Sequence, residues 1–133
     1  MKKIVSLLLA LICIVCALGS VGCSKYVSRY YAIAFVHSNE SDSAFMEFYS
    51  FEGTMVFRMR AADASGKLRF SAKLEDGSAK VYYDCGGTKT ELFTLHAGDE
   101  IDSSVDLGRA GTVYVIVETD GECRNGSLHF EIG

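Results

Sequence analysis

The chain has 133 residues, a formal net charge of −4, no proline and no tryptophan. The acidic balance argues against nucleic-acid binding, which relies on basic surfaces that contact phosphates. The length allows one domain with a single modest core.

The first 22 residues have the three-part order of a secretory signal. Residues 1–3 are Met-Lys-Lys, residues 4–18 are apolar apart from one serine, and residues 19–22 are small. The apolar stretch has 15 residues, whereas a membrane-spanning helix needs about 20. We therefore expect residues 1–22 to be a cleaved signal peptide. Its loss would export the mature chain and take the net charge from −4 to −6.

The small residues lead directly into Cys23. The junction Val21-Gly22-Cys23 resembles the lipobox of bacterial lipoproteins, in which a small residue precedes a cysteine that receives lipid and becomes the new N-terminus. Ser20 departs from that pattern, which usually has an aliphatic residue there. The resemblance implies a membrane-anchored lipoprotein with residues 23–29 as a lipidated, polar tether. Ser20 and Gly22 also fit an ordinary small-x-small cleavage site, which would release a soluble secreted protein.

Residues 30–133 show an alternation of apolar and polar side chains with period two, which is typical of strands with one buried face. The first runs cover residues 30–37, 44–51 and 54–62. In the third run the apolar residues share one side, and two arginines share the other. The apolar residues are Met55, Phe57, Met59 and Ala61, and the arginines are Arg58 and Arg60.

The clearest pattern covers residues 67–85, where two alternating runs flank the dipeptide Asp76-Gly77. An Asp-Gly dipeptide between alternating runs predicts a β-hairpin with a two-residue turn. This register puts all the apolar side chains of both runs on one face. The predicted pairs are Glu75–Ser78, Leu74–Ala79, Ala72–Val81 and Phe70–Tyr83.

Four further runs follow, at residues 91–95, 101–107, 112–118 and 128–132. About nine short strands without a sustained helical period predict an all-β fold, an antiparallel β-sandwich or jelly-roll-like domain over residues 30–133. The layout is loosely similar to the jelly-roll accessory domains of secreted bacterial hydrolases. That likeness concerns fold type only, and a fold does not fix a function.

The cysteines predict one disulfide. Cys13 and Cys16 would leave with the signal, which leaves three cysteines in an oxidising compartment. If Cys23 carries lipid, Cys85 and Cys123 remain as a pair, and we expect a structural bridge between them. A free or intermolecular thiol on Cys23 is the alternative.

Two sets of outward side chains are candidate binding residues. A basic stripe would suit an anion, such as a phospholipid headgroup or a phosphate-rich wall polymer; in the predicted register it contains a like-charge pair, Lys73 facing Lys80. Two tyrosines, Tyr82 and Tyr114, could stack sugars. Ordinary surface residues are the alternative for both sets. The stripe consists of Arg58, Arg60, Arg69, Lys73 and Lys80.

No catalytic constellation is visible in the sequence. The histidines, His37, His96 and His129, lack metal-ligand spacing, and no Gly-x-Ser-x-Gly elbow is present. Acids gather at residues 99–106 and 118–122 without a compact calcium-binding loop. We therefore expect no enzyme activity, cofactor or metal.

The predicted function is that of a surface module with a binding or structural role. Its ligand would be a cell-wall polymer, a carbohydrate or a protein. The alternative is a small hydrolase or metal-dependent domain whose site is assembled only by folding.

Overall fold

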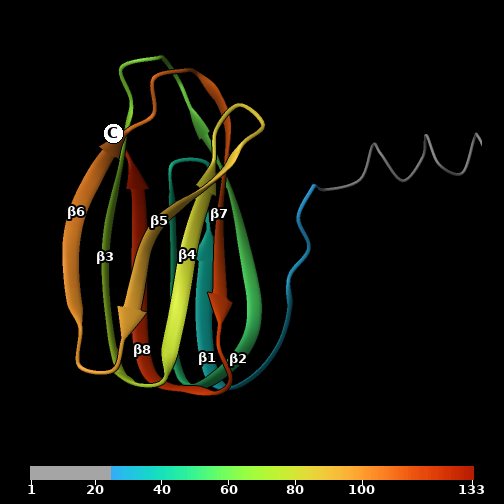
Figure 1. Cartoon of the computed structure of the whole chain (residues 1–133). Helices are drawn as coiled ribbons and strands as arrows, with labels where there is room; N and C mark the ends of the chain where they lie inside the picture. Colours follow the sequence, from blue (N-terminus) through green and yellow to red (C-terminus); the bar gives the residue numbers. More distant parts are fainter. Residues whose placement is uncertain (1–24) are drawn as a thin grey trace, which may run out of the picture.

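The computed structural model describes residues 25–133 (Figure 1). The signal peptide and Cys23 lie outside the described residues. The described part contains eight strands and no helix, and therefore no helix that could cross a membrane. The strands are β1 (Arg29–Asn39), β2 (Ser43–Ala61), β3 (Lys67–Asp76), β4 (Ser78–Asp84), β5 (Lys89–His96), β6 (Glu100–Asp106), β7 (Gly111–Thr119) and β8 (Cys123–Ile132).

The eight strands form two layers that share β2. All pairings are antiparallel, in the order β5-β4-β7-β2-β8-β3-β6, with β1 also paired to β2. We call β6, β3, β8, β1 and the first half of β2 layer A, and β5, β4, β7 and the second half of β2 layer B. Figure 1 shows β4 and β5 of layer B in front of β1 and β8 of layer A. The predicted all-β, antiparallel fold is confirmed.

From β2 onward, every connection except the β4–β5 hairpin passes from one layer to the other. This arrangement resembles that of two-layered jelly rolls, in which neighbouring strands of a layer are distant in sequence. It has a functional consequence, because side chains that share an outer face come from widely separated parts of the chain.

The length of β2 explains why there are eight strands where about nine were expected. The runs 44–51 and 54–62 belong to this single strand, whose first half pairs with β1 and β8 and whose second half pairs with β7. The buried apolar side chains occupy even positions up to Phe48 and odd positions from Phe51 onward. Gly53 follows just after this change, with a φ of +128° and no room for a Cβ beside the carbonyl of Arg29. Glycine is therefore required there.

The predicted β3–β4 hairpin is wrong. β3 pairs with β8 and β6, whereas β4 pairs with β5 and β7. The turn at Asp76-Gly77 instead leads from layer A to layer B. A turn that connects the two layers, called an arch, places the apolar sides of both strands toward one core, as a hairpin also does. The alternation of apolar residues therefore could not tell an arch from a hairpin. The pairs Glu75–Ser78, Leu74–Ala79, Ala72–Val81 and Phe70–Tyr83 do not form.

The core fills the space between the layers, and most predicted inward faces are confirmed. Phe70 of β3 stacks on Phe93 of β5 with 5.0 Å between ring centroids, and Phe57 of β2 lies 6.0 Å from Phe130 of β8. Burial of such apolar surface is the main force that holds two layers together. The buried residues include Leu68, Phe70, Ala72, Leu74, Ala79, Val81, Val113, Val115, Val117, Leu128, Phe130 and Ile132.

The predicted disulfide is also wrong, because Cys85 and Cys123 are both free thiols. The Cys123 Sγ lies 3.3 Å from the carbonyl oxygen of Ser78, where β4 begins, and Cys85 follows the last residue of β4. A seven-residue strand spans roughly 20 Å. A disulfide needs Cα atoms within about 7 Å of each other. Burial raises the pKa of both thiols, which keeps them protonated.

Candidate functional site

The outer face of layer A carries side chains in register across four strands. Phe45 of β2 pairs with His129 of β8, which pairs with Ser71 of β3, which pairs with Asp102 of β6. Residues that pair across neighbouring strands project on the same side of a sheet. These four residues therefore form one row at right angles to the strands.

Two further rows flank it. One contains Ser43, Glu131, Arg69 and Ser104, and the other contains Glu47, Ser127, Lys73 and Glu100.

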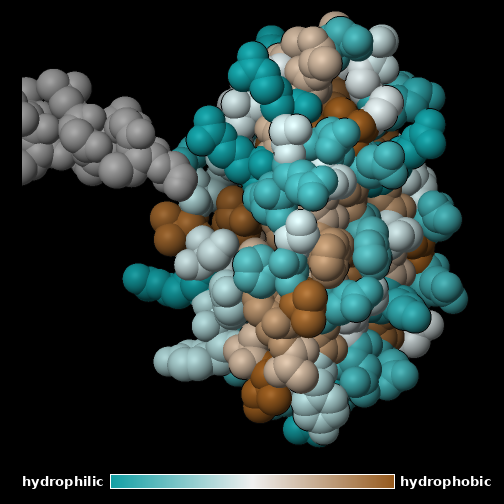
Figure 2. Space-filling view, turned by 180° about the vertical axis from the view of Figure 1, so that it is seen from behind, coloured by the Kyte–Doolittle hydropathy of each residue, from teal (hydrophilic) through white to brown (hydrophobic). Residues whose placement is uncertain are grey.

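Three hollows on this face join into one shallow groove. Their volumes are about 440, 340 and 550 Å³. The first and second share Ser71, Asp102 and His129, and the second and third share Glu47, Lys73 and Ser127. We call this feature the groove. Figure 2, the view from behind, shows hydrophobic residues scattered among hydrophilic ones rather than gathered in a single patch.

An aromatic pair forms part of the groove floor. The ring of Phe45 stacks on the ring of His129, with 5.6 Å between centroids and 18° between planes. Phe45 is half-buried and His129 is exposed. The pair offers a flat apolar surface beside polar groups, which suits the C–H face of a sugar ring.

The groove is acidic. Its basic residues are Arg69 and Lys73. Its acidic residues are Glu47, Glu75, Glu100, Asp102 and Glu131. Six of these charged residues make no ion pair with any other described residue, and only Glu47 does, with His129. The six are Arg69, Lys73, Glu75, Glu100, Asp102 and Glu131. The groove therefore favours neutral or positively charged ligands over anions.

Backbone strain is concentrated beside the third hollow. Ala34 of β1 and Asn125 of β8 are the two non-glycine residues with positive φ in the described chain, at 49° and 51°. The pairing registers place both opposite Tyr49 of β2, one on each side. Both line the third hollow. Left-handed conformations cost such residues about 1–2 kcal/mol and tend to cluster at functional sites.

The groove also contains a Ser-His-Glu cluster, which bears on the enzyme alternative. The Ser127 Oγ lies 3.1 Å from the His129 Nε2, and the Glu47 Oε1 lies 3.4 Å from the same nitrogen. A catalytic triad needs the carboxylate on one ring nitrogen and the nucleophile on the other. With both groups at Nε2, the carboxylate cannot orient the ring for proton transfer from the serine. This cluster therefore does not support nucleophilic catalysis.

No metal site is formed by the residues from 25 to 133, where no three His, Cys, Asp or Glu side chains are close enough to share an ion. Of the three histidines, only His129 lines any of the hollows described for the layer A face. The acidic residues expected near 99–106 contribute Glu100 and Asp102 to the groove instead.

The predicted sugar-stacking tyrosines lie on layer B, on the opposite side of the sandwich, and both have neighbours against their rings. Tyr26 contacts Tyr114 edge to face, with 5.2 Å between centroids. The Lys89 Nζ sits 4.3 Å from the centroid of the Tyr82 ring and also forms a 2.7 Å ion pair with Glu118. Both tyrosines are half-buried. Their role as sugar platforms stays a prediction.

The predicted basic stripe is divided between the two layers. Arg69 and Lys73 lie on layer A, while Arg58, Arg60 and Lys80 lie on layer B. Lys73 pairs with Glu100 and Ser127 rather than with Lys80. The predicted like-charge pair is therefore wrong, because it depended on the β3–β4 hairpin. Anion binding by these residues stays a prediction.

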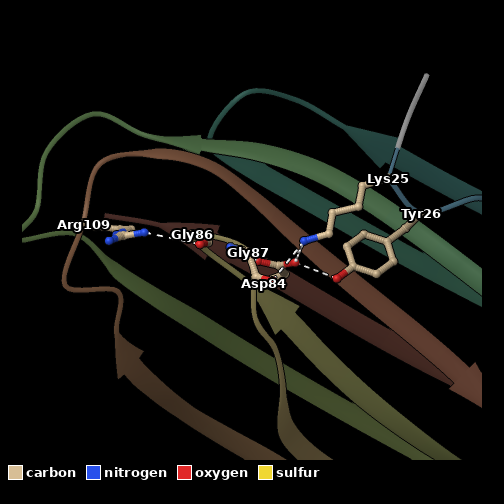
Figure 3. Close-up of polar contacts among 6 residues, drawn as sticks. All are labelled: Lys25, Tyr26, Asp84, Gly86, Gly87 and Arg109. Carbon is tan, nitrogen blue, oxygen red and sulfur yellow. Dashed lines mark hydrogen bonds and ion pairs between the residues drawn. The ribbon is translucent and has the colours of Figure 1, made fainter. Parts of the chain in front are cut away.

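Residues 25–28, which we call the N-terminal strap, are docked against layer B. The Lys25 Nζ donates to the Asp84 Oδ2 at 2.8 Å, and the Tyr26 hydroxyl donates to the same oxygen at 2.6 Å (Figure 3). The Gly87 N–H donates to the Asp84 Oδ1 at 2.7 Å. At the other end of the strap, the Ser28 Oγ accepts from the N–H of Val56 in β2 at 2.9 Å.

Asp84 is the centre of this docking, since only 2% of its side chain is exposed. Burial by itself raises the pKa of this carboxyl, but the hydrogen bonds from Lys25, Tyr26 and Gly87 outweigh burial, so its pKa lies below the ordinary value. The hydrogen bond to Asp84 raises the pKa of Lys25. The pair is therefore ionised at neutral pH.

Sequence reasoning missed most of the groove. The outward polar side chains of β2, β3 and β8 are visible in the alternation, but their adjacency depends on the strand order. No sequence signal reveals that residue 45 lies beside residue 129, or residue 71 beside residue 102. Similarly, the sequence predicts only a polar tether at residues 23–29, because Asp84, which holds residues 25 and 26, is far from them in sequence.

No family model matches the chain, and no curated protein matches it by sequence. Among solved structures it is similar to TmCBM61 in complex with β-1,4-galactotriose, at 12% identity and a TM-score of 0.49, over 80% of this chain and 87% of that chain. It is also similar to PliG of Salmonella Typhimurium, a periplasmic inhibitor of g-type lysozyme, at 16% identity and a TM-score of 0.45, over 84% and 92%. A mutant of the family 29 carbohydrate-binding module CBM29-2 is similar at 15% identity and a TM-score of 0.39, over 78% of this chain and 72% of that chain. These values assign neither a family nor a ligand.

Proposed function

We propose that the mature chain is an exported, non-catalytic binding module, anchored by lipid on Cys23, whose groove holds a glycan chain. The observation that supports a glycan ligand is the continuous groove across layer A, with the Phe45–His129 pair in its floor. The anchor rests on the N-terminal sequence pattern alone.

The shape of the groove favours an extended polymer over a small molecule. Sites for small molecules enclose most of the ligand surface in a deep, largely apolar cavity. Here three joined hollows instead follow the open face of a sheet. A chain of repeating units can contact each hollow in turn, so that several weak contacts add.

The chemistry of the lining suits hydroxyl groups, which both donate and accept hydrogen bonds. Arg69 and Lys73 are donors, the carboxylates are acceptors, and Ser71 and Ser127 can act as either. Because acids outnumber bases in the groove, the ligand is neutral or carries amino groups, as in amino sugars. Uronic-acid and phosphate-bearing polymers would meet electrostatic repulsion.

The cysteine count no longer supports the lipid anchor. The odd number left after signal removal favoured lipid on Cys23 only if Cys85 and Cys123 were bridged, and they are free. What supports the anchor is the order of charged, apolar and small residues that leads into Cys23. Intact-mass analysis of the membrane-extracted protein tests it, since a lipid-modified Cys23 adds the mass of its acyl groups.

Binding by the groove is tested with glycan oligomers in solution calorimetry, after a screen against neutral, amino-bearing and acidic polysaccharides. We expect Phe45→Ala to weaken binding by about tenfold or more, which corresponds to about 1.4 kcal/mol. Tyr82→Ala on layer B is the matched control and should leave the affinity unchanged. If Tyr82→Ala weakens binding and Phe45→Ala does not, the ligand lies on the other face. Preferential binding of acidic polysaccharides would contradict the assigned ligand class.

A further inference from the structure

The position of the strap bears on how the domain sits at the membrane. A lipidated N-terminus on a free tether would let a domain tumble. Here residues 25 and 26 are held to the domain: Lys25 and Tyr26 both bond to the buried Asp84, and Tyr26 also contacts Tyr114. The Lys25 Nζ additionally donates to the carbonyl oxygen of Gly87 at 3.1 Å.

Chain length then limits the distance between the anchor and the domain. Two residues of extended chain span at most about 7 Å, so a lipid on Cys23 would tie the membrane surface closely to the docked Lys25. The loop of residues 85–88 is next to Lys25, and Arg109 donates to the carbonyl oxygen of Gly86 at 3.3 Å (Figure 3). A lipid on Cys23 would bring the headgroup layer to this end of layer B.

The charge at this end is compatible with a phospholipid surface. Lys25 is neutralised by Asp84, while the exposed Arg109 has no carboxylate partner among the described residues. An arginine close to anionic headgroups is attracted by about 1 kcal/mol. The groove lies on the opposite face of the sandwich, on layer A.

We propose that the strap fixes the orientation of the domain, with the 85–88 loop and Arg109 against the lipid surface and the groove turned away from it. This inference rests on the lipid anchor of the proposed function and is independent of the ligand in the groove. In Figure 1 the strap, in blue, runs along the outside of β2 from the start of β1.

Docking of the strap is tested by limited trypsin digestion of the full mature lipoprotein, read by intact mass. The bond after Lys25 should resist cleavage in the wild type and be cut several-fold faster in Asp84→Asn. Asp106→Asn, which alters an exposed carboxylate paired with Lys67 on layer A, is the control and should behave as the wild type. Equal cleavage rates in all three proteins would show that Asp84 does not hold the strap.

Orientation is tested by fluorescence, because the natural chain has no tryptophan. Thr88→Trp places a single probe in the 85–88 loop, and Ser104→Trp places one on the layer A face of β6. The lipoproteins are reconstituted into vesicles that contain brominated phospholipid, which quenches tryptophan on contact. We expect several-fold stronger quenching for Thr88→Trp, and a smaller difference between the probes when Asp84→Asn is added.

Two results would overturn the proposal. Equal quenching of the two probes in the otherwise natural chain would mean that the domain has no fixed orientation. An intact mass without lipid on Cys23 would remove the anchor on which the orientation depends. Neither result bears on glycan binding, which is measured separately on the groove variants.

Discussion

The two outer faces of the sandwich differ in whether their aromatic and charged side chains are covered by neighbours or line a hollow. On layer B, Lys25 bonds to Asp84, and Lys89 pairs with Glu118 while covering Tyr82. On layer A, Arg69 and Asp102 point into the groove without an ionic partner among the described residues. On layer B the rings of Tyr82 and Tyr114 are already in contact with Lys89 and Tyr26, whereas the unpaired charged groups of layer A line a hollow and are available to bind. This contrast favours layer A as the binding face.

Among the predicted substitutions, one at the point where β2 passes from layer A to layer B should lower the free energy of unfolding most. Gly53→Ala would place a Cβ against the Arg29 carbonyl at the position where β2 passes between the layers. We expect a loss of about 3 kcal/mol or more in the free energy of unfolding, measured by urea denaturation. Gly121→Ala is the matched control: its φ is also positive, at +77°, but no atom lies within 4 Å of the added Cβ. Similar losses of unfolding free energy in both variants would show that the close contact with the Arg29 carbonyl does not make Gly53 special.

Removal of the Asp84 carboxylate should have the next largest effect. Asp84→Ala leaves the Tyr26 hydroxyl and the Gly87 N–H without their acceptor. Loss of a buried acceptor of this kind costs about 1–3 kcal/mol, which urea denaturation detects. Asp106→Ala, at an exposed carboxylate, should change stability by at most about 0.5 kcal/mol.

The pH dependence of the Asp84→Ala effect gives a second measure of the same contact. A carboxyl with a lowered folded pKa stabilises the fold above its unfolded pKa of about 3.9, and the contribution disappears as the pH falls through the folded pKa. Lys25, whose pKa is raised, loses its contribution only as the pH rises above about 10.4. The stability difference between wild type and variant should therefore be constant from about pH 5 to 9. A midpoint near pH 7 would contradict this assignment.

The smallest predicted effect concerns the strained backbone beside the third hollow. Ala34→Gly should stabilise the protein by up to about 1 kcal/mol, because glycine adopts positive φ without the penalty that alanine pays. Ala32→Gly, on the same strand but at an ordinary extended position, should destabilise it by a similar amount. Thermal denaturation of both variants checks the opposite signs. If both variants are destabilised equally, Ala34 is not strained in solution.

Local patterns predicted the strands well and their partners poorly. The alternation at residues 67–75 and 112–118 identified the buried sides of β3 and β7, because burial of one face imposes a period of two. The Asp76-Gly77 dipeptide identified a turn, but its local geometry serves both a hairpin and an arch between layers. The predicted disulfide and the Lys73–Lys80 pair relied on longer-range placement in the same way, and neither forms.

By itself, the sequence determined the class of fold and the inward face of most of the strands for which it predicted one, and it carries the pattern ending at Cys23 from which export is predicted. These features follow from local properties: the period of apolar residues, turn chemistry and the order of charge and hydrophobicity. Only the tertiary structure decided which strands are neighbours, and hence that Phe45, His129, Ser71 and Asp102 share a row and that Asp84 holds the strap. Strand order depends on how two apolar faces pack across a common core. The apolar–polar alternation of a single strand shows which side is buried but not which strands lie next to it.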